Sequence, residues 1–485
     1  MVQRGRLGLG LGMAALAAAG LPVAALAKAQ ANGQPASILP AAPAQQKPAP
    51  QQTPAAAPQI QPAPVATATP GAAQTPQPAP TPVPVPISQL KVLPIDEPVM
   101  AWSKGNAQAL LAVIEKIEAE GLIPADYQPE KLRAAIAAGE GTALDAQASK
   151  SFAWLAEDMR DGRTRMQSRL QWYVIDRDVE TNSITQLMTS ALASGDVGAT
   201  IIGLAPTHPD YAALKALYAA TPKTDKARKT IQINLDRWRW LPREMGKYYL
   251  LTNLPEFQLR LTVDNSIIRS YRTVVGKPGK TATPNLAETV QNVVFNPTWT
   301  VPQSIVVGEG LGARLLANPR QAARENYKVT KNKDGTVTVV QQPGDGNSLG
   351  RMKIDMPNPH AIYLHDTPSK SLFNTPVRAY SHGCVRTERA VELGMTIAIL
   401  GAGLTPEQAV QHNLSGKYTK VPLTKTFPVY LTYFTMATGI DGKMGKFADI
   451  YGRDVPVLAS FAKPREAWNG QRQTSEKVVK LDNPL

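Results

Sequence analysis

The sequence has few of the features that cross-link a chain or hold it in a membrane. Cys384 is the only cysteine in 485 residues, so the chain cannot form an intramolecular disulfide. No cysteine follows the apolar run near the N-terminus, which excludes a lipoprotein anchor, and no later stretch is long and apolar enough to cross a bilayer. Internal repeats are absent as well. With 43% hydrophobic and 19% charged residues, the composition indicates a soluble globular protein with room for two or three domains.

The N-terminus has the pattern of an export signal. Arg4 and Arg6 precede an apolar run, and Ala25-Leu26-Ala27 has the small residues of a cleavage site. We therefore expect residues 1–27 to be a signal peptide, with an uncleaved membrane anchor as the alternative. Residues 28–88 are dominated by Pro, Ala and Gln and offer too little apolar surface to order themselves, so they are expected to form a disordered tether.

Acidic residues are in short supply. The chain has 38 Asp and Glu against 52 Lys and Arg, which gives a formal net charge of +14. For an exported protein, this excess of positive charge favours an anionic polymer of the cell envelope over nucleic acid as a partner.

Residues 89–245 are predicted to be helical. Leu110, Val113, Ile114 and Ile117 follow a helical period, and we expect Asn106 to cap this helix and Gly121 to end it. The same period recurs over 148–159 and 184–191, and a fourth helix is predicted to end within 234–242. We expect its Trp238 and Trp240 to pack against a neighbouring domain rather than to stack on a sugar.

Residues 246–465 have the period of strands. Apolar residues alternate from Phe257 to Val263, and Asp264-Asn265-Ser266 predicts a hairpin turn into the next strand. Residues 308–348, with a second turn at Asp334-Gly335, are expected to form a short lid or subdomain over a cleft, and Asp441-Gly442 marks a late turn. One helix is predicted over 387–400, and a polar tail over 466–485. The fold class is therefore α+β: a disordered tether, an all-helical domain and a β-rich domain.

Most of the residues able to do chemistry lie in one short stretch, 380–386. It contains His382, Gly383, Cys384 and Arg386. A lone thiol in an exported chain indicates intermolecular pairing or a working nucleophile, and the alternative is a small buried side chain. We expect the helix predicted after Cys384, together with the charge of Arg386, to lower the pKa of the thiol. The backbone amides of Gly383 and Cys384 are expected to form an oxyanion hole.

Two histidines compete for the role of base, and the residues alone do not choose between them. His382 is adjacent in sequence, whereas His365 has to be brought close by the fold. Asp366 would point to the opposite face of a strand from His365, so a backbone carbonyl is better placed to hold the imidazole. Tyr363 would share the face of His365, either as a donor to an oxyanion or as ordinary core packing.

A zinc site made of His365, His382 and Cys384 is a weaker alternative, because the spacing of known zinc motifs is not met. The remaining histidines have no such neighbours and are expected to be structural or exposed. They are His208, His360 and His412.

The stretch Ser381-His382-Gly383-Cys384-Val385-Arg386, with His365 upstream, resembles the signature of the L,D-transpeptidases, the YkuD-domain enzymes. The similarity covers roughly 230–455, and residues 89–229 more weakly resemble the helical scaffold of the larger Gram-negative members. The resemblance implies Cys384 as nucleophile and His365 as base, and no metal or cofactor. It implies that the remaining motif residues organise the site or serve the oxyanion: Tyr363, Ser381, His382, Gly383 and Arg386.

By this resemblance the chain is expected to work in the periplasm on stem peptides of peptidoglycan, whose free carboxylates suit a basic protein. Cys384 would form a thioester at a carbonyl that follows an L-centre, at the first or the third stem residue, and a diaminopimelate amine would resolve it into a cross-link. Carbapenems would acylate the same thiol. The larger relatives insert a peptidoglycan-binding module that has no room between Tyr218 and Ile231 here. Two alternatives stay open, an L,D-carboxypeptidase or amidase on the same fold and a wall-binding protein without catalysis.

Overall fold

The computed structural model describes residues 98–174 and 182–465. The expected signal peptide (1–27), the whole expected tether (28–88) and the polar tail (466–485) lie outside these residues. Among the described helices, none has the length and apolarity needed to cross a membrane. The order of the elements matches the expected class, α+β with the helices first.

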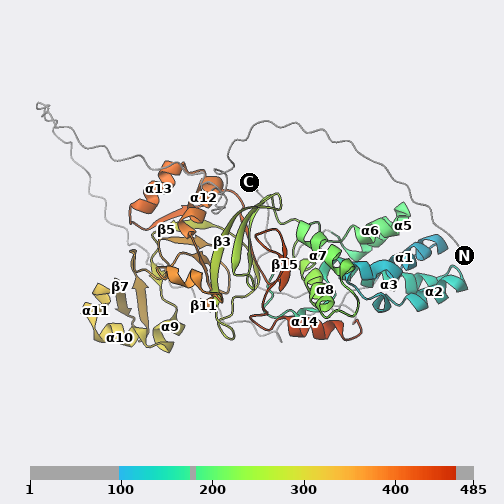
Figure 1. The fold of residues 1–485 in the computed structure, drawn as a ribbon, viewed down its shortest axis with the longest axis horizontal. Helices are drawn as coiled ribbons and strands as arrows, with labels where there is room; N and C mark the ends of the chain where they lie inside the picture. Colours follow the sequence, from blue (N-terminus) through green and yellow to red (C-terminus); the bar gives the residue numbers. More distant parts are fainter. Residues whose placement is uncertain (1–97, 175–181, 466–485) are drawn as a thin grey trace, which may run out of the picture. The chain divides into compact units, whose positions relative to one another are not determined.

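The N-terminal half consists of helices that end where the sequence supplies a stop (Figure 1). The first helix continues into a 3-10 turn, which Gly121 ends in a left-handed conformation, φ 75°, as expected. The expected cap was wrong: Ser103 caps this helix, because its side chain accepts from the amide of Asn106. The helices are α1 Lys104–Lys116, η2 Ile117–Glu120, η3 Pro124–Tyr127, α2 Pro129–Ala138, α3 Thr142–Asp161, η4 Met166–Ser168, α5 Ile184–Ser194, α6 Val197–Ile202, α7 Pro209–Ala220 and α8 Ala227–Trp238.

These helices divide between two hydrophobic cores. One core is formed within α1 to α6, with Leu110, Phe152 and Met188 fully buried. The helices α7 and α8 instead share a core with the β-rich half, near β15 (Met436–Thr438) in Figure 1. Trp238 stacks on Phe434 with ring centroids 4.6 Å apart, and the expectation that the end of this helix packs on the next domain is confirmed.

The β-rich half is built on one mixed sheet of eleven strands, in the order β13-β5-β9-β10-β12-β3-β2-β1-β14-β4 with β11 beside β3. The predicted hairpin turn is present between β2 and β3, with Asp264 and Asn265 both at positive φ. The strands are β1 Tyr248–Asn253, β2 Gln258–Val263, β3 Ser266–Gly276, β4 Leu286–Thr289, β5 Asn292–Phe295, β9 Met352–Asp355, β10 Leu364–His365, β11 Ala379–Ser381, β12 Val385–Thr387, β13 Thr419–Pro422 and β14 Pro428–Thr432.

Further elements flank this sheet. The helix predicted over 387–400 is α12 Ala390–Ala402, and it starts later than expected because residues 385–387 pair into the sheet as β12. The turn expected at Asp441-Gly442 joins a small hairpin. The other elements are η5 Lys370–Asn374, α13 Pro406–Leu414, β15 Met436–Thr438, β16 Met444–Lys446 and α14 Asp454–Phe461.

Residues 299–341 form a small subdomain with a core of its own, which includes Val306, Leu315 and Val339. Its sheet has the order β6-β8-β7, and the turn expected at Asp334-Gly335 joins β7 to β8, with Gly335 at φ 83°. In Figure 1 its helices lie together with β7. Its elements are β6 Trp299–Thr300, α9 Gln303–Gly308, α10 Leu311–Ala317, α11 Pro319–Arg324, β7 Tyr327–Lys331 and β8 Val337–Gln341.

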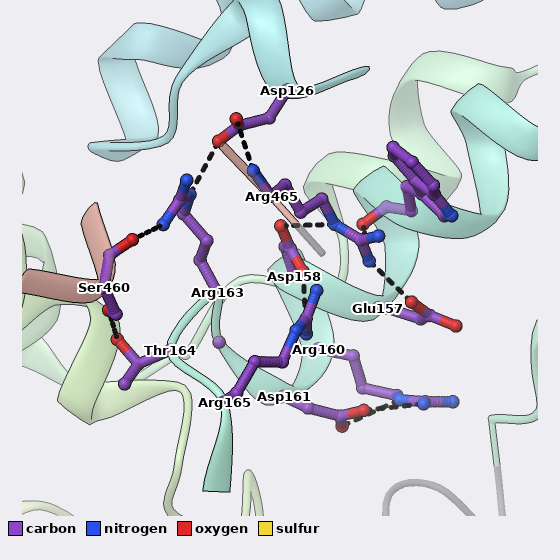
Figure 2. Close-up of polar contacts among 12 residues, drawn as sticks. Asp126, Glu157, Asp158, Arg160, Asp161, Arg163, Thr164, Arg165, Ser460 and Arg465 are labelled. Carbon is purple, nitrogen blue, oxygen red and sulfur yellow. Dashed lines mark hydrogen bonds and ion pairs between the residues drawn. The ribbon is translucent and has the colours of Figure 1, made fainter. Parts of the chain in front are cut away.

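A buried ionic cluster ties the end of the described chain to the N-terminal helices (Figure 2). The guanidinium of Arg465 lies 2.6 Å from Glu157 and 3.0 Å from Asp158, and its backbone amide donates to Asp126. Arg163 pairs with the same Asp126 at 2.6 Å. Since charges this deep in a protein are tolerated only when paired, the cluster fixes where the chain leaves the β-rich half.

Candidate active site

The site is assembled by two adjacent parallel strands at the middle of the large sheet. β10 pairs with β12 so that Leu364 faces Val385 and His365 faces Arg386. One step earlier, the amide of Val385 donates to the carbonyl of Tyr363, which sets Tyr363 beside Cys384. Because side chains alternate along a strand and paired residues share a face, the side chains of Tyr363, His365, Cys384 and Arg386 belong to one face.

His365 is held as a neutral imidazole. The residue is 5% exposed, and its Nδ1 donates to the backbone carbonyl of Asp366. Burial, together with the nearby positive charge of Arg386, lowers the pKa of His365 to about 3. The carboxylate of Asp366 contacts Lys370 and the amide of Arg351 instead. A backbone carbonyl orients the ring, as expected, and Nε2 is left as the nitrogen that can accept a proton.

Cys384 is partly exposed, and its sulfur lies 3.6 Å from the carbonyl oxygen of Ala361. Burial raises the pKa of the thiol, although hydrogen bonds from Tyr363 and the charges of Lys353 and Arg386 oppose the rise. The expectation of a lowered thiol pKa was therefore wrong. The helix that was expected to lower it is separated from Cys384 by β12, so its dipole acts from too far away.

Ser381 holds the two peptides that flank the Gly383–Cys384 peptide bond. Its hydroxyl donates to the carbonyl of Cys384 at 2.6 Å and accepts from the amide of Gly383 at 3.1 Å. Gly383 has φ 122°, a conformation that side chains rarely adopt. Because the Gly383 amide already donates to the Ser381 hydroxyl, the amide of Cys384 and the hydroxyl of Tyr363 are the donors available to an oxyanion.

His382 and Arg386 have different surroundings. The Nε2 of His382 lies 2.9 Å from Glu309 at the end of α9, so this imidazole contacts the small subdomain and its side chain is 46% exposed. Arg386 lies opposite His365 in the pairing of β12 with β10. Its Nε is buried and has no hydrogen-bond partner within the described residues. Its charge lowers the pKa of both His365 and Cys384.

Comparison with known proteins identifies two domains in the chain. Residues 247–396 match the family model described as the L,D-transpeptidase catalytic domain, YkuD, and residues 97–217 match the Scaffold domain. The chain contains an L,D-transpeptidase catalytic domain. The scaffold precedes it, and only six residues, 221–226, connect α7 to α8.

A curated relative from Haemophilus influenzae, named "Putative L,D-transpeptidase", is 31% identical over 253 residues, which are 49% of this chain and 50% of the relative. The chain thus spans about half the length of the relative that it matches. Solved structures that match part of the chain include an L,D-transpeptidase from Mycobacterium smegmatis, at 14% identity and TM-score 0.20 over 39% of this chain and 59% of that one. Another is the catalytic domain from an Enterococcus faecium L,D-transpeptidase acylated by ertapenem, at 16% identity and TM-score 0.20 over 39% and 98%.

Several contacts of the L,D-transpeptidase domain have no signal in the sequence. Thr283 donates its hydroxyl to the carbonyl of Gly383, and Tyr451 bonds to the segment that contains Thr283. The ammonium of Lys353 lies 4.3 Å from the ring centroid of Tyr363. None of the three lies within the motif, and only the tertiary structure brings them to it.

The other histidines of the described chain have structural partners, as expected. His208 stacks on Trp238 with centroids 4.3 Å apart, His360 packs on Tyr173 and His412 on Phe295. In residues 98–174 and 182–465, no group of three His, Cys, Asp or Glu side chains is placed to hold a metal ion.

Proposed function

We propose that this chain is a periplasmic L,D-transpeptidase that cross-links peptidoglycan stem peptides through a thioester on Cys384. The observation that carries the proposal is the strand pairing of β10 with β12. It puts the Cys384 thiol, the Tyr363 hydroxyl and the neutral His365 imidazole, with its Nε2 available, on one face of the sheet. A cysteine nucleophile needs a base beside it and donors for the charge that develops on the attacked carbonyl.

In the first step Cys384 attacks a stem-peptide carbonyl that follows an L-centre. A bond forms from sulfur to carbon while the thiol proton passes to Nε2 of His365. The negative charge on the carbonyl oxygen is stabilised by the amide of Cys384 and the hydroxyl of Tyr363. When the carbon–nitrogen bond breaks, His365 returns the proton to the departing amine, and the thioester remains.

In the second step an amine of diaminopimelate on another stem attacks the thioester. His365 accepts the proton of that amine, the carbon–sulfur bond breaks, and the thiol is restored. Donation from the third stem residue gives 3-3 links, and donation from the first gives 1-3 links. The positive net charge of the chain favours the acidic stems in both roles.

The pKa values define the resting state of this mechanism. Since burial raises the pKa of Cys384 and lowers that of His365, the pair rests as thiol and neutral imidazole rather than as an ion pair. Proton transfer then accompanies attack on the substrate carbonyl. A carbapenem would react by the same first step, with the β-lactam nitrogen as leaving group.

The test uses the purified chain, defined tetrapeptide and pentapeptide stems, and mass spectrometry of the products. Dimers whose mass equals donor plus acceptor minus the leaving amino acid or peptide support transpeptidation. Because donation from the first stem residue releases a longer peptide than donation from the third, the dimer mass and its fragmentation separate 3-3 from 1-3 links. Shortened monomers without dimers would show a carboxypeptidase instead. Cys384→Ala should abolish dimers and leave sacculus binding intact; dimers in that variant would refute Cys384 as nucleophile, and the absence of any product from the parent chain would favour a wall-binding protein.

A further inference from the structure

The peptide bond between Gly383 and Cys384 is held from outside the motif by Thr283. The Thr283 hydroxyl lies 2.7 Å from the carbonyl oxygen of Gly383 and 2.9 Å from the amide nitrogen of Gly276. Thr283 is completely buried, 100 residues before Gly383 in sequence. A buried hydroxyl with two such partners has a fixed position.

The chemistry of the two partners also fixes the direction of each hydrogen bond. The Gly276 amide can only donate, so the Thr283 oxygen accepts from it. The hydroxyl proton of Thr283 is then available to the Gly383 carbonyl, which can only accept. Tyr451 braces the same segment, because its hydroxyl donates to the carbonyl of Gly276 at 2.7 Å and accepts from the amide of Thr283 at 3.3 Å.

The orientation of this peptide bond decides whether the oxyanion has a donor. In a planar trans peptide the C=O and the following N–H point in opposite directions. With the Gly383 carbonyl held toward Thr283, the Cys384 amide points the other way. Gly383, at φ 122°, has no side chain to resist rotation of the peptide, so the local backbone does not select this orientation by itself.

We propose that Thr283 is a positioning residue for the oxyanion hole: its hydroxyl holds the Gly383–Cys384 peptide so that the Cys384 amide donates to the developing oxyanion. The proposal rests on the acyl-transfer function proposed above. Without the hydroxyl the peptide is free to turn, and the Gly383 carbonyl would then face the oxyanion instead of an N–H group. Removal of one oxyanion-hole donor lowers acyl-transfer rates by about 100- to 1,000-fold, which sets the scale of the expected effect.

The test compares two reactions of the same thiol in the full chain. Acylation by imipenem passes through an oxyanion, whereas alkylation by iodoacetamide displaces iodide from a saturated carbon and forms none. Thr283→Val keeps the branched volume and removes the hydroxyl. We expect it to lower the acylation rate constant about 100-fold, within the oxyanion-donor scale, and to leave the alkylation rate nearly unchanged.

Three further variants separate positioning from packing. Thr283→Ser keeps the hydroxyl and should acylate at close to the parent rate. Tyr451→Phe removes a hydroxyl from the same network without touching Gly383, and should acylate far faster than Thr283→Val. Thr283→Ala deletes the hydroxyl together with the methyl group. It replaces Thr283→Val as the hydroxyl-free variant if the latter folds poorly, and the same fall in the acylation rate is expected of it.

The proposal is overturned if Thr283→Val acylates at the parent rate, or if acylation and alkylation fall together, because the second result means that Cys384 itself has moved. Failure of both hydroxyl-free variants to fold would also overturn it and would assign Thr283 to stability alone. A parent chain that imipenem acylates but that forms no dimers would refute transpeptidation and leave the role of Thr283 intact. A parent chain that imipenem does not acylate would refute the proposed acyl-transfer function itself.

Discussion

Replacement of His365 by Gln tests the electrostatics on which the proposed mechanism depends. Burial and Arg386 lower the pKa of His365 from 6.5 to about 3. This lowering corresponds to roughly 5 kcal/mol against charging the imidazole in the folded chain. The residue is 5% exposed, so solvent screens little of this cost. At neutral pH the imidazole therefore accepts a proton only when the thiol gives one up.

The same shift has a consequence for stability, with a definite sign. As the pH falls below 6.5, the unfolded chain protonates His365, whereas the folded chain does not do so until about pH 3. The contribution of this group to the free energy of unfolding is complete above pH 6.5 and is lost between pH 6.5 and about 3. Between pH 7 and pH 4 the loss amounts to about 3 kcal/mol.

Urea unfolding at pH 7 and pH 4 measures this loss. His365→Gln keeps an N–H group that can reach the Asp366 carbonyl but cannot be charged, so its free energy of unfolding should fall by about 3 kcal/mol less than that of the parent chain. His382→Gln is the control, because it replaces an imidazole whose side chain is 46% exposed. NMR of the five histidines, assigned by single substitutions, should show His365 still neutral at pH 4. Equal pH dependence in the parent and His365→Gln, or a His365 titration near pH 6.5, would refute the reasoning.

Three further outcomes are expected. Alkylation of Cys384 by iodoacetamide should accelerate about tenfold per pH unit up to pH 9, because burial raises the thiol pKa; a plateau between pH 5 and 8 would instead indicate a thiolate–imidazolium pair. Arg465→Met leaves buried carboxylates without their cation and should lower the free energy of unfolding by about 3–5 kcal/mol in urea titrations. Arg133→Met, at an exposed ion pair, should have no measurable effect, and equal losses in the two variants would contradict the burial argument. Glu309→Ala should speed hydrogen exchange in α9 by removing its contact with His382 while the alkylation rate of Cys384 stays the same; unchanged exchange would show that this contact does not hold the small subdomain.

Local features of the fold could be predicted because the residues that determine them are close in sequence. The turns at Asp264-Asn265 and Asp334-Gly335 depend on residues that tolerate positive φ, and both are where the sequence placed them. Element boundaries were less secure. The helix after Cys384 starts at Ala390 rather than 387, and that shift of less than one turn removed the dipole argument for a reactive thiolate.

Contacts across the sheet could not be predicted in the same way. Thr283 lies in a stretch of Thr, Ala and Pro with no catalytic pattern, and its role depends on the pairing that brings β3 beside β11 and β12. Arg465 stands where a polar tail was expected to begin, and a charged residue near a chain end is normally solvated. Its burial depends on carboxylates contributed by helices more than 300 residues earlier.

The amino-acid sequence by itself indicated the candidate reactive groups, since a single thiol, two histidines and a Gly-Cys pair leave few other candidates. Only the tertiary structure decided the protonation states of these groups and which side chain, Thr283, holds the Gly383 carbonyl beside the thiol. A pKa depends on burial and on charges that arrive from distant strands, and a peptide orientation depends on the partner that its carbonyl finds. Both are properties of neighbours in space.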